Sequence, residues 1–166
     1  MIRKALSSLP LVILLASPCL AQDNSYSWTS TGSGSVSNTG SGIASQRDKT
    51  YTNAAGQSVG VTHNGAVNTS VPGSPTWESS TTATGPNGKQ ASAASSGGAT
   101  KNEDGSYSWG GSTTATSPGG RQATSQRSGT GTRTAGGSSW TSNRSGTGFG
   151  GATRQRQSSG SRQRNR

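Results

Sequence analysis

The fold of this chain is decided by the stretch Trp77–Gly97, WESSTTATGPNGKQASAASSG, because the chain repeats it from Trp109 to Gly129 with 12 identities in 21 positions. In both copies a Thr-rich segment leads into a turn signal and then into a second polar segment. Side chains alternate between the two faces of a strand, and threonine and aromatic residues suit a pleated surface. The repeat therefore predicts pairs of strands joined by tight turns.

Turn signals recur along the chain at intervals of about 14 to 18 residues. All contain glycine, which accepts positive φ, and five of them add proline or asparagine, which favour turns. The signals are Asn53–Gly56, Pro72–Pro75, Gly85–Gly88, Asn102–Gly105, Ser117–Gly120, Thr134–Gly137 and Phe149–Gly151. This rhythm predicts an all-β antiparallel meander of roughly 16-residue strand-turn repeats. A β-solenoid is the alternative, but its coils would need two or three corners per period.

The N-terminus has the features of a secretory signal peptide. Arg3 and Lys4 precede the short apolar run Leu9–Ala16, and we expect cleavage after Ala21. A lipoprotein signal with Cys19 as the lipidated residue is the alternative. The mature protein is expected in the periplasm, at the cell surface or outside the cell. We divide the chain into the signal peptide 1–21, a disordered Ser/Gly-rich lead segment 22–45, a β repeat region 46–151 and a disordered Arg-rich tail 152–166.

The composition leaves little material for a hydrophobic core. Residues 22–166 contain 29 Ser, 22 Thr and 26 Gly but no Leu and no Met. A fully buried apolar side chain contributes about 1.5–3 kcal/mol, while ordering one residue costs about 1–2 kcal/mol. We expect the aromatic residues to form a sparse core or cross-strand ladder, with stacking on sugars as the alternative. They are Tyr26, Trp28, Trp77, Tyr107, Trp109 and Trp140.

The charge is concentrated in the last third. The formal net charge is +10, and residues 121–166 contain nine arginines and no acidic residue. Guanidinium groups suit phosphate, sulfate and carboxylate, so these arginines imply a polyanion such as extracellular DNA, lipopolysaccharide or acidic polysaccharide. A solvated tail is the alternative. Only Trp140 and Phe149 are aromatic in this third, fewer than a single-strand nucleic-acid binder needs. The candidate binding residues are Arg121, Arg127, Arg133, Arg144, Arg154, Arg156, Arg162, Arg164 and Arg166.

No constellation of catalytic residues is visible. His63 is the only histidine, the single cysteine lies in the signal peptide, and the five acidic residues form no paired motif. The turn Asn102–Gly105 contains two acids, but the regular spacing of calcium-binding repeats is missing. We therefore expect no enzyme, no cofactor, no metal site and no small-molecule substrate.

The turn Thr84–Gly88, TGPNG after a Thr-rich strand, resembles turns of repeat-rich secreted and cell-surface proteins of bacteria. The resemblance implies an exported surface or matrix protein and carries no catalytic residue. We expect a structural or adhesive role, with open sheet edges that allow self-association. A polyanion-binding module acting through the arginine-rich third is the alternative.

Overall fold

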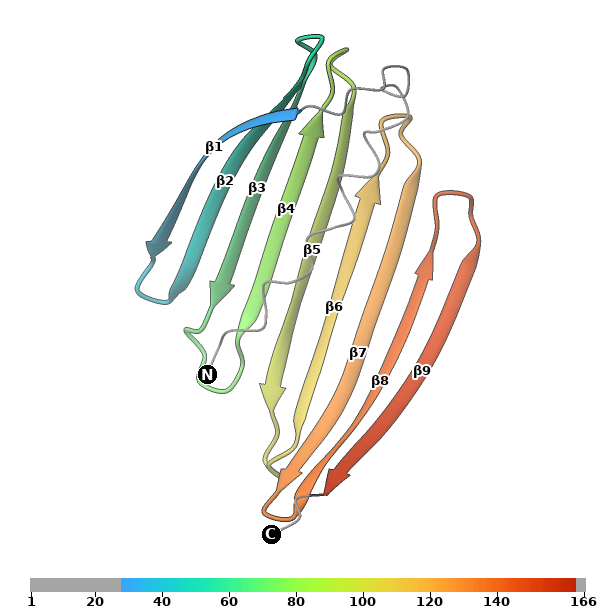
Figure 1. Cartoon of the computed structure of the whole chain (residues 1–166). Helices are drawn as coiled ribbons and strands as arrows, with labels where there is room; N and C mark the ends of the chain where they lie inside the picture. The colour runs from blue at the N-terminus through green and yellow to red at the C-terminus, as the bar shows by residue number, and fades with distance from the viewer. Residues whose placement is uncertain (1–27, 164–166) are drawn as a thin grey trace.

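The computed structural model describes residues 28–163, without the side chain of Trp28, and these residues form one antiparallel sheet (Figure 1). Each strand pairs with the strands that precede and follow it in the chain, so β1 and β9 are the two edges. This arrangement confirms the all-β meander and differs from the solenoid. The strands are β1 Trp28–Asn38, β2 Gly42–Asn53, β3 Ser58–Asn68, β4 Thr76–Thr84, β5 Gln90–Lys101, β6 Tyr107–Thr116, β7 Gln122–Thr134, β8 Gly137–Thr147 and β9 Thr153–Gln163.

Each of the seven predicted turn signals marks a junction between consecutive strands, although Asn53, Thr134 and Gly137 belong to the strands themselves. The turn between β1 and β2 was not predicted. In the turn Gly85–Lys89, the Gly88 amide donates to the Gly85 carbonyl at 3.0 Å, and the Gly85 amide donates to the Lys89 carbonyl at 2.9 Å. Gly88 has φ +72°, so this is a type I turn followed by a left-handed residue. The same pair of bonds and the same positive-φ glycine recur in 53–57, 102–106, 117–121 and 148–152.

The sheet extends further at both ends than the sequence predicts. β1 lies in the Ser/Gly-rich lead segment and β9 occupies most of the tail, both of which we expected to be disordered. β9 has no apolar residue and β1 has only Trp28 and Val36, but strand pairing satisfies backbone amides and carbonyls whatever the side chains are. All eleven residues of β9 are in register with β8, from Gly137↔Gln163 to Thr147↔Thr153. The signal peptide and its alternative, Cys19, lie outside the described residues.

The register sorts the side chains onto two faces, because directly opposed residues in an antiparallel pair project to the same side. One face, here called the arginine face, carries Arg127, Arg144 and Arg156. The other, here called the hydroxyl face, carries Thr130, Thr141 and Ser159. On β7, β8 and β9 every residue of the hydroxyl face is Ser, Thr, Asn, Gln or Gly. One sheet thus presents two chemically different surfaces.

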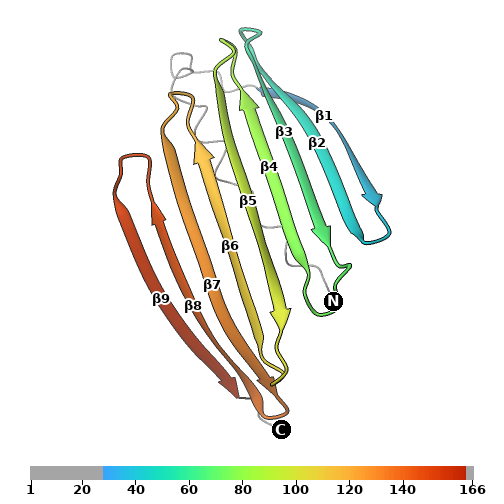
Figure 2. The same ribbon diagram turned by 180° about the vertical axis from the view of Figure 1, so that it is seen from behind.

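The apolar core is small. Among the described residues the buried hydrophobic side chains are Val59, Ala83 and Ala91, and the registers place all three on the arginine face. The described strands form a single layer, which Figure 2 shows from behind. Hydroxyl pairs add to the backbone ladders: the Oγ1 atoms of Thr130 and Thr141 are 3.0 Å apart. The sheet is therefore held together chiefly by hydrogen bonds rather than by a packed interior.

Candidate polyanion-binding face

Three arginines form one row across the C-terminal strands. Arg127 on β7 lies directly opposite Arg144 on β8, which lies directly opposite Arg156 on β9. Opposed residues in antiparallel strands have Cβ atoms about 4.5–5.5 Å apart, so the three side chains leave the sheet as neighbours. All three are exposed. The fold thus gathers charges that are 12 to 17 residues apart in the sequence into one compact cationic row.

The other six predicted arginines fall into four groups. Arg133 and Arg162 both lie opposite Ser138, so they form a second, wider row on the arginine face. Arg154 lies on the same face opposite Gly146. Arg121 lies in the turn before β7, where its amide donates to the Ser117 hydroxyl at 3.1 Å, and it joins neither row. The remaining two, Arg164 and Arg166, lie outside the described residues.

The arginine face carries no acidic residue in the described strands. Both strand acids, Asp48 and Glu78, lie on the hydroxyl face, and Asp48 accepts a hydrogen bond from the Thr62 hydroxyl at 2.7 Å. Opposed like charges destabilise a sheet by a few tenths of a kcal/mol to about 1 kcal/mol. The arginine row therefore carries a repulsion that a bound anion would remove.

Three more cations on this face were not among the predicted binding residues. One of them, Lys101 on β5, lies directly opposite Tyr107. The other two lie on β2. Arg47 and Lys49 on β2 lie opposite Gly34 and Gly32, on the arginine face and at the far side of the sheet from β9. Nothing in the sequence joins them to the arginine-rich third, since they are separated from it by more than 70 residues. Only the shared face of the sheet relates them.

The aromatic residues pair with glycines rather than with one another. Trp77, Trp109 and Trp140 lie directly opposite Gly97, Gly129 and Gly160. A β-carbon added to Gly129 would lie 2.5 Å from Cζ2 of Trp109, so the indole occupies the space above the glycine. The predicted ladder is therefore a set of separate tryptophan–glycine pairs on β4–β5, β6–β7 and β8–β9. Tyr26 and the side chain of Trp28 lie outside the described part of the chain.

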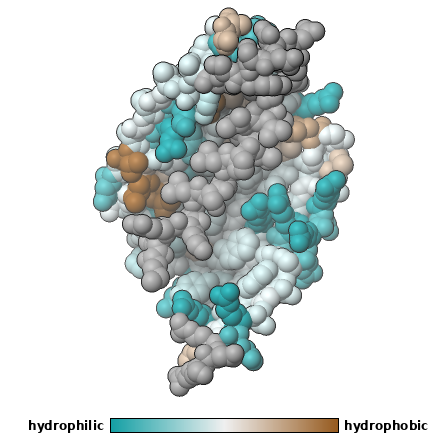
Figure 3. Space-filling model, viewed as in Figure 1, coloured by the Kyte–Doolittle hydropathy of each residue, from teal (hydrophilic) through white to brown (hydrophobic). Residues whose placement is uncertain are grey.

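An apolar patch lies on the arginine face over β1 to β4, away from the arginine row on β7 to β9. Ile43, Val67 and Trp77 stand in one row on β2, β3 and β4, and Val36 of β1 is 75 % exposed beside them. In Figure 3 strongly hydrophobic residues are in view on the side of β1 and β2, and hydrophilic residues are in view on both sides. This apolar patch shares β2 with Arg47 and Lys49, so cations lie on both sides of the arginine face.

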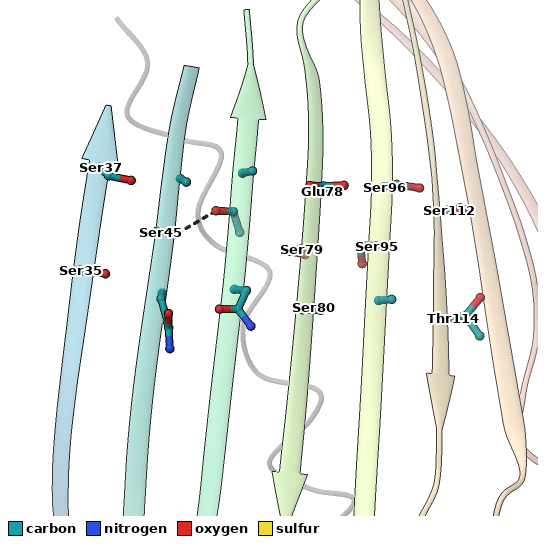
Figure 4. Close-up of a pocket in the computed structure, with 16 residues that line it drawn as sticks. Ser35, Ser37, Ser45, Glu78, Ser79, Ser80, Ser95, Ser96, Ser112 and Thr114 are labelled. Carbon is teal, nitrogen blue, oxygen red and sulfur yellow. Dashed lines mark hydrogen bonds between the residues drawn. The ribbon is translucent and has the colours of Figure 1, made fainter. Parts of the chain in front are cut away.

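The hydroxyl face is hollowed along its middle. One hollow of about 720 Å³ is lined by short polar side chains from β1 to β6, including Ser35, Ser80, Ser96 and Thr114 (Figure 4). A second, of about 740 Å³, continues it to β9 through Gln126, Asn143 and Gln155. Glu78 is the one acidic group lining these two hollows. The hollow offers hydrogen-bonding groups but no nucleophile–base pair.

The remaining residues considered for chemistry have structural partners. His63 Nδ1 lies 2.8 Å from Thr81 Oγ1, on the arginine face. In the turn before β6, Asp104 accepts a hydrogen bond from the Ser106 amide at 2.8 Å. The Ser106 hydroxyl and amide lower the pKa of the Asp104 carboxyl below its usual value. Over residues 28–163 there is no cluster of three metal-ligating side chains and no helix long and apolar enough to cross a membrane.

The candidate site therefore consists of the arginine face over β6 to β9. The sequence named the arginines but not their alignment, which follows from strand register. Comparison with known proteins gave no significant match to a protein-family model, a curated protein or a solved structure.

Proposed function

We propose that this protein is an exported, non-enzymatic binding protein that holds an anionic polymer on the arginine face of its sheet. The observation that supports this most directly is the unbroken row Arg127, Arg144 and Arg156 on a face without acidic residues. Guanidinium forks recognise phosphate, sulfate and carboxylate, and a polymer supplies these groups in series. Its affinity should fall steeply as salt rises, because binding releases counterions.

The test compares two variants that lose equal charge. R144Q/R156Q removes two arginines from the row, whereas K89Q/R121Q removes two charges from turns. Binding to a DNA oligomer and to a sulfated polysaccharide is measured against salt concentration. The row variant should bind more weakly and lose about two units of the logarithmic salt slope, while the turn variant should stay close to the wild type. Equal losses in both variants would show diffuse charge attraction and refute the site.

A second candidate, a self-associating structural or adhesive protein, is favoured by the exposed edge strand β1. Its eleven residues contain no charge and no proline, the two devices that usually prevent edge-to-edge pairing. The other edge is different, because β9 carries Arg154, Arg156 and Arg162. Pairing through β1 is therefore less opposed by charge than pairing through β9.

Strand direction decides the form of such an assembly. With nine alternating strands, β1 and β9 run in the same direction, so copies related by translation would meet as parallel strands. The antiparallel alternative joins β1 to β1 of a second copy and produces a closed dimer. Sedimentation should show this dimer in the wild type and its loss in S33K/S35K on β1. The matched variant S159K/S161K on β9 should remain dimeric; a monomeric wild type, or fibrils in all three proteins, would refute the arrangement.

A further inference from the structure

Two arginine rows enclose a strip of aromatic residues on the arginine face. The first row contains Arg127, Arg144 and Arg156 on β7, β8 and β9. Trp109 follows in the next row, and Tyr107 and Trp140 share the row after that. Arg133 and Arg162 form the second arginine row, at the other end of the strip. Arg162 lies six positions after Arg156 on β9, which corresponds to about 20 Å along an antiparallel strand.

This neighbourhood is hidden in the sequence. Tyr107 and Trp109 precede the arginine-rich third, but β6 pairs with β7, so their side chains lie beside those of the arginines. By sequence alone, residues 121–166 offer only Trp140 and Phe149, too few aromatic residues for a single-strand binder. The register supplies two more, because strands adjacent in the sheet share their rows.

The row of Tyr107 and Trp140 has the form of a stacking platform. Its members alternate between aromatic residue and glycine: Tyr107, Gly131, Trp140 and Gly160 on four successive strands. A β-carbon at Gly160 would lie 2.9 to 3.1 Å from three ring atoms of Trp140, so the indole lies across the glycine. Tyr107 and Trp140 are each 47 % exposed. Gly131 lies between the two aromatic residues, and Gly160 lies beneath the indole of Trp140. Because neither glycine has a side chain, a flat group has room to stack on the rings.

We propose that the strip from Arg156 to Arg162 binds single-stranded nucleic acid, with bases on Trp140 and Tyr107 and phosphates on the two arginine rows. This inference rests on the proposed polyanion-binding function and specifies its ligand. Single-strand sites combine a cationic groove with exposed aromatic rings, since every base has a face that stacks. A duplex shows the same phosphates but keeps its bases inside, and a sulfated polysaccharide has no aromatic group.

The first experiment compares four ligands at one salt concentration. They are a thymidine oligomer of about twelve nucleotides, the same backbone without bases, a duplex of equal length and a sulfated polysaccharide. Tryptophan fluorescence and anisotropy report binding. The oligomer with bases should bind about tenfold more tightly than the abasic one and should quench tryptophan emission. Equal binding of the two oligomers would refute base stacking while leaving the polyanion function intact, and no binding of any ligand would refute both.

The second experiment assigns the platform. Trp140→Leu should weaken binding of the thymidine oligomer about tenfold and leave the abasic oligomer unaffected. Trp77→Leu is the matched control, because Trp77 also covers a glycine but lies on β4, three strands from Arg127. Circular dichroism checks that both variants retain the sheet. If Trp140→Leu loses the sheet, Tyr107→Ser tests the platform in its place. The assignment would be overturned if Trp140→Leu and Trp77→Leu lowered the affinity for the thymidine oligomer equally. It would also be overturned if Trp140→Leu lost more affinity for the polysaccharide than for the oligomer.

Discussion

The indole of Trp109 occupies the space above Gly129 where a β-carbon would otherwise project. A β-carbon built on Gly129 would lie 2.5 Å from Trp109 Cζ2 and 2.5 Å from the Thr141 carbonyl oxygen. The pair arises because β6 and β7 place Trp109 directly opposite Gly129. The relationship recurs for Trp77 with Gly97 and for Trp140 with Gly160, so the three pairs lie on the hairpins β4–β5, β6–β7 and β8–β9. It explains why the sequence repeat runs from a tryptophan to a glycine.

Gly129→Ala should destabilise the sheet by about 1–3 kcal/mol, because the new methyl group has no room beneath the indole. Gly131→Ala is the control on the same strand and face. Its β-carbon would meet the Ser139 carbonyl oxygen at 3.5 Å, an ordinary contact. Urea unfolding followed by circular dichroism measures both. Equal stabilities of the two variants would contradict the packing described for Trp109.

Arg144→Gln should stabilise the free protein by a few tenths of a kcal/mol to about 1 kcal/mol at low salt, since Arg144 lies between two other arginines. The gain should shrink as salt screens the repulsion. Arg133→Gln is the comparison, because Arg133 faces Ser138 rather than a charge. Thermal unfolding at two salt concentrations gives the result. A salt-independent change, or the same gain for Arg133→Gln, would contradict repulsion within the row.

Gly120→Ala should cost about 1 kcal/mol or more, because Gly120 has φ +77° in the turn between β6 and β7. No atom lies within 4 Å of a β-carbon at this position, so the cost is conformational rather than steric. Gly119→Ala, at the preceding residue with negative φ, should be nearly neutral. The difference in unfolding free energy between these neighbouring variants isolates the requirement for a left-handed residue.

The Asp104 turn should make stability depend on pH in the acid range. Hydrogen bonds from Ser106 lower the pKa of Asp104 in the folded state, so the folded state prefers the ionised carboxylate. The resulting stabilisation is present above the unfolded pKa of about 3.9 and is lost as pH falls through the folded pKa. Asp104→Asn should therefore lower stability at neutral pH, and the difference from the wild type should disappear in strong acid. A difference that persists there would show that the carboxylate charge is not involved.

The strand-and-turn pattern was predictable because its causes are local. The turn Gly85–Lys89 needs a glycine with positive φ at Gly88, and the sequence shows that glycine directly. The ends of the sheet were harder to predict. β1 and β9 contain few of the residues that favour strands, and they are ordered through backbone bonds to a neighbour that sequence patterns do not identify.

The sequence by itself determined the all-β class, the places of seven turns, the repeat of tryptophan and glycine, and the concentration of arginine in the last third. Only the tertiary structure decided which of these side chains meet. Strand register aligned Arg127 with Arg144 and Arg156, and it placed Tyr107 and Trp140 in one row on either side of Gly131. A shift of one residue in any strand would send its side chains to the opposite face, so the candidate site depends on pairings between distant segments.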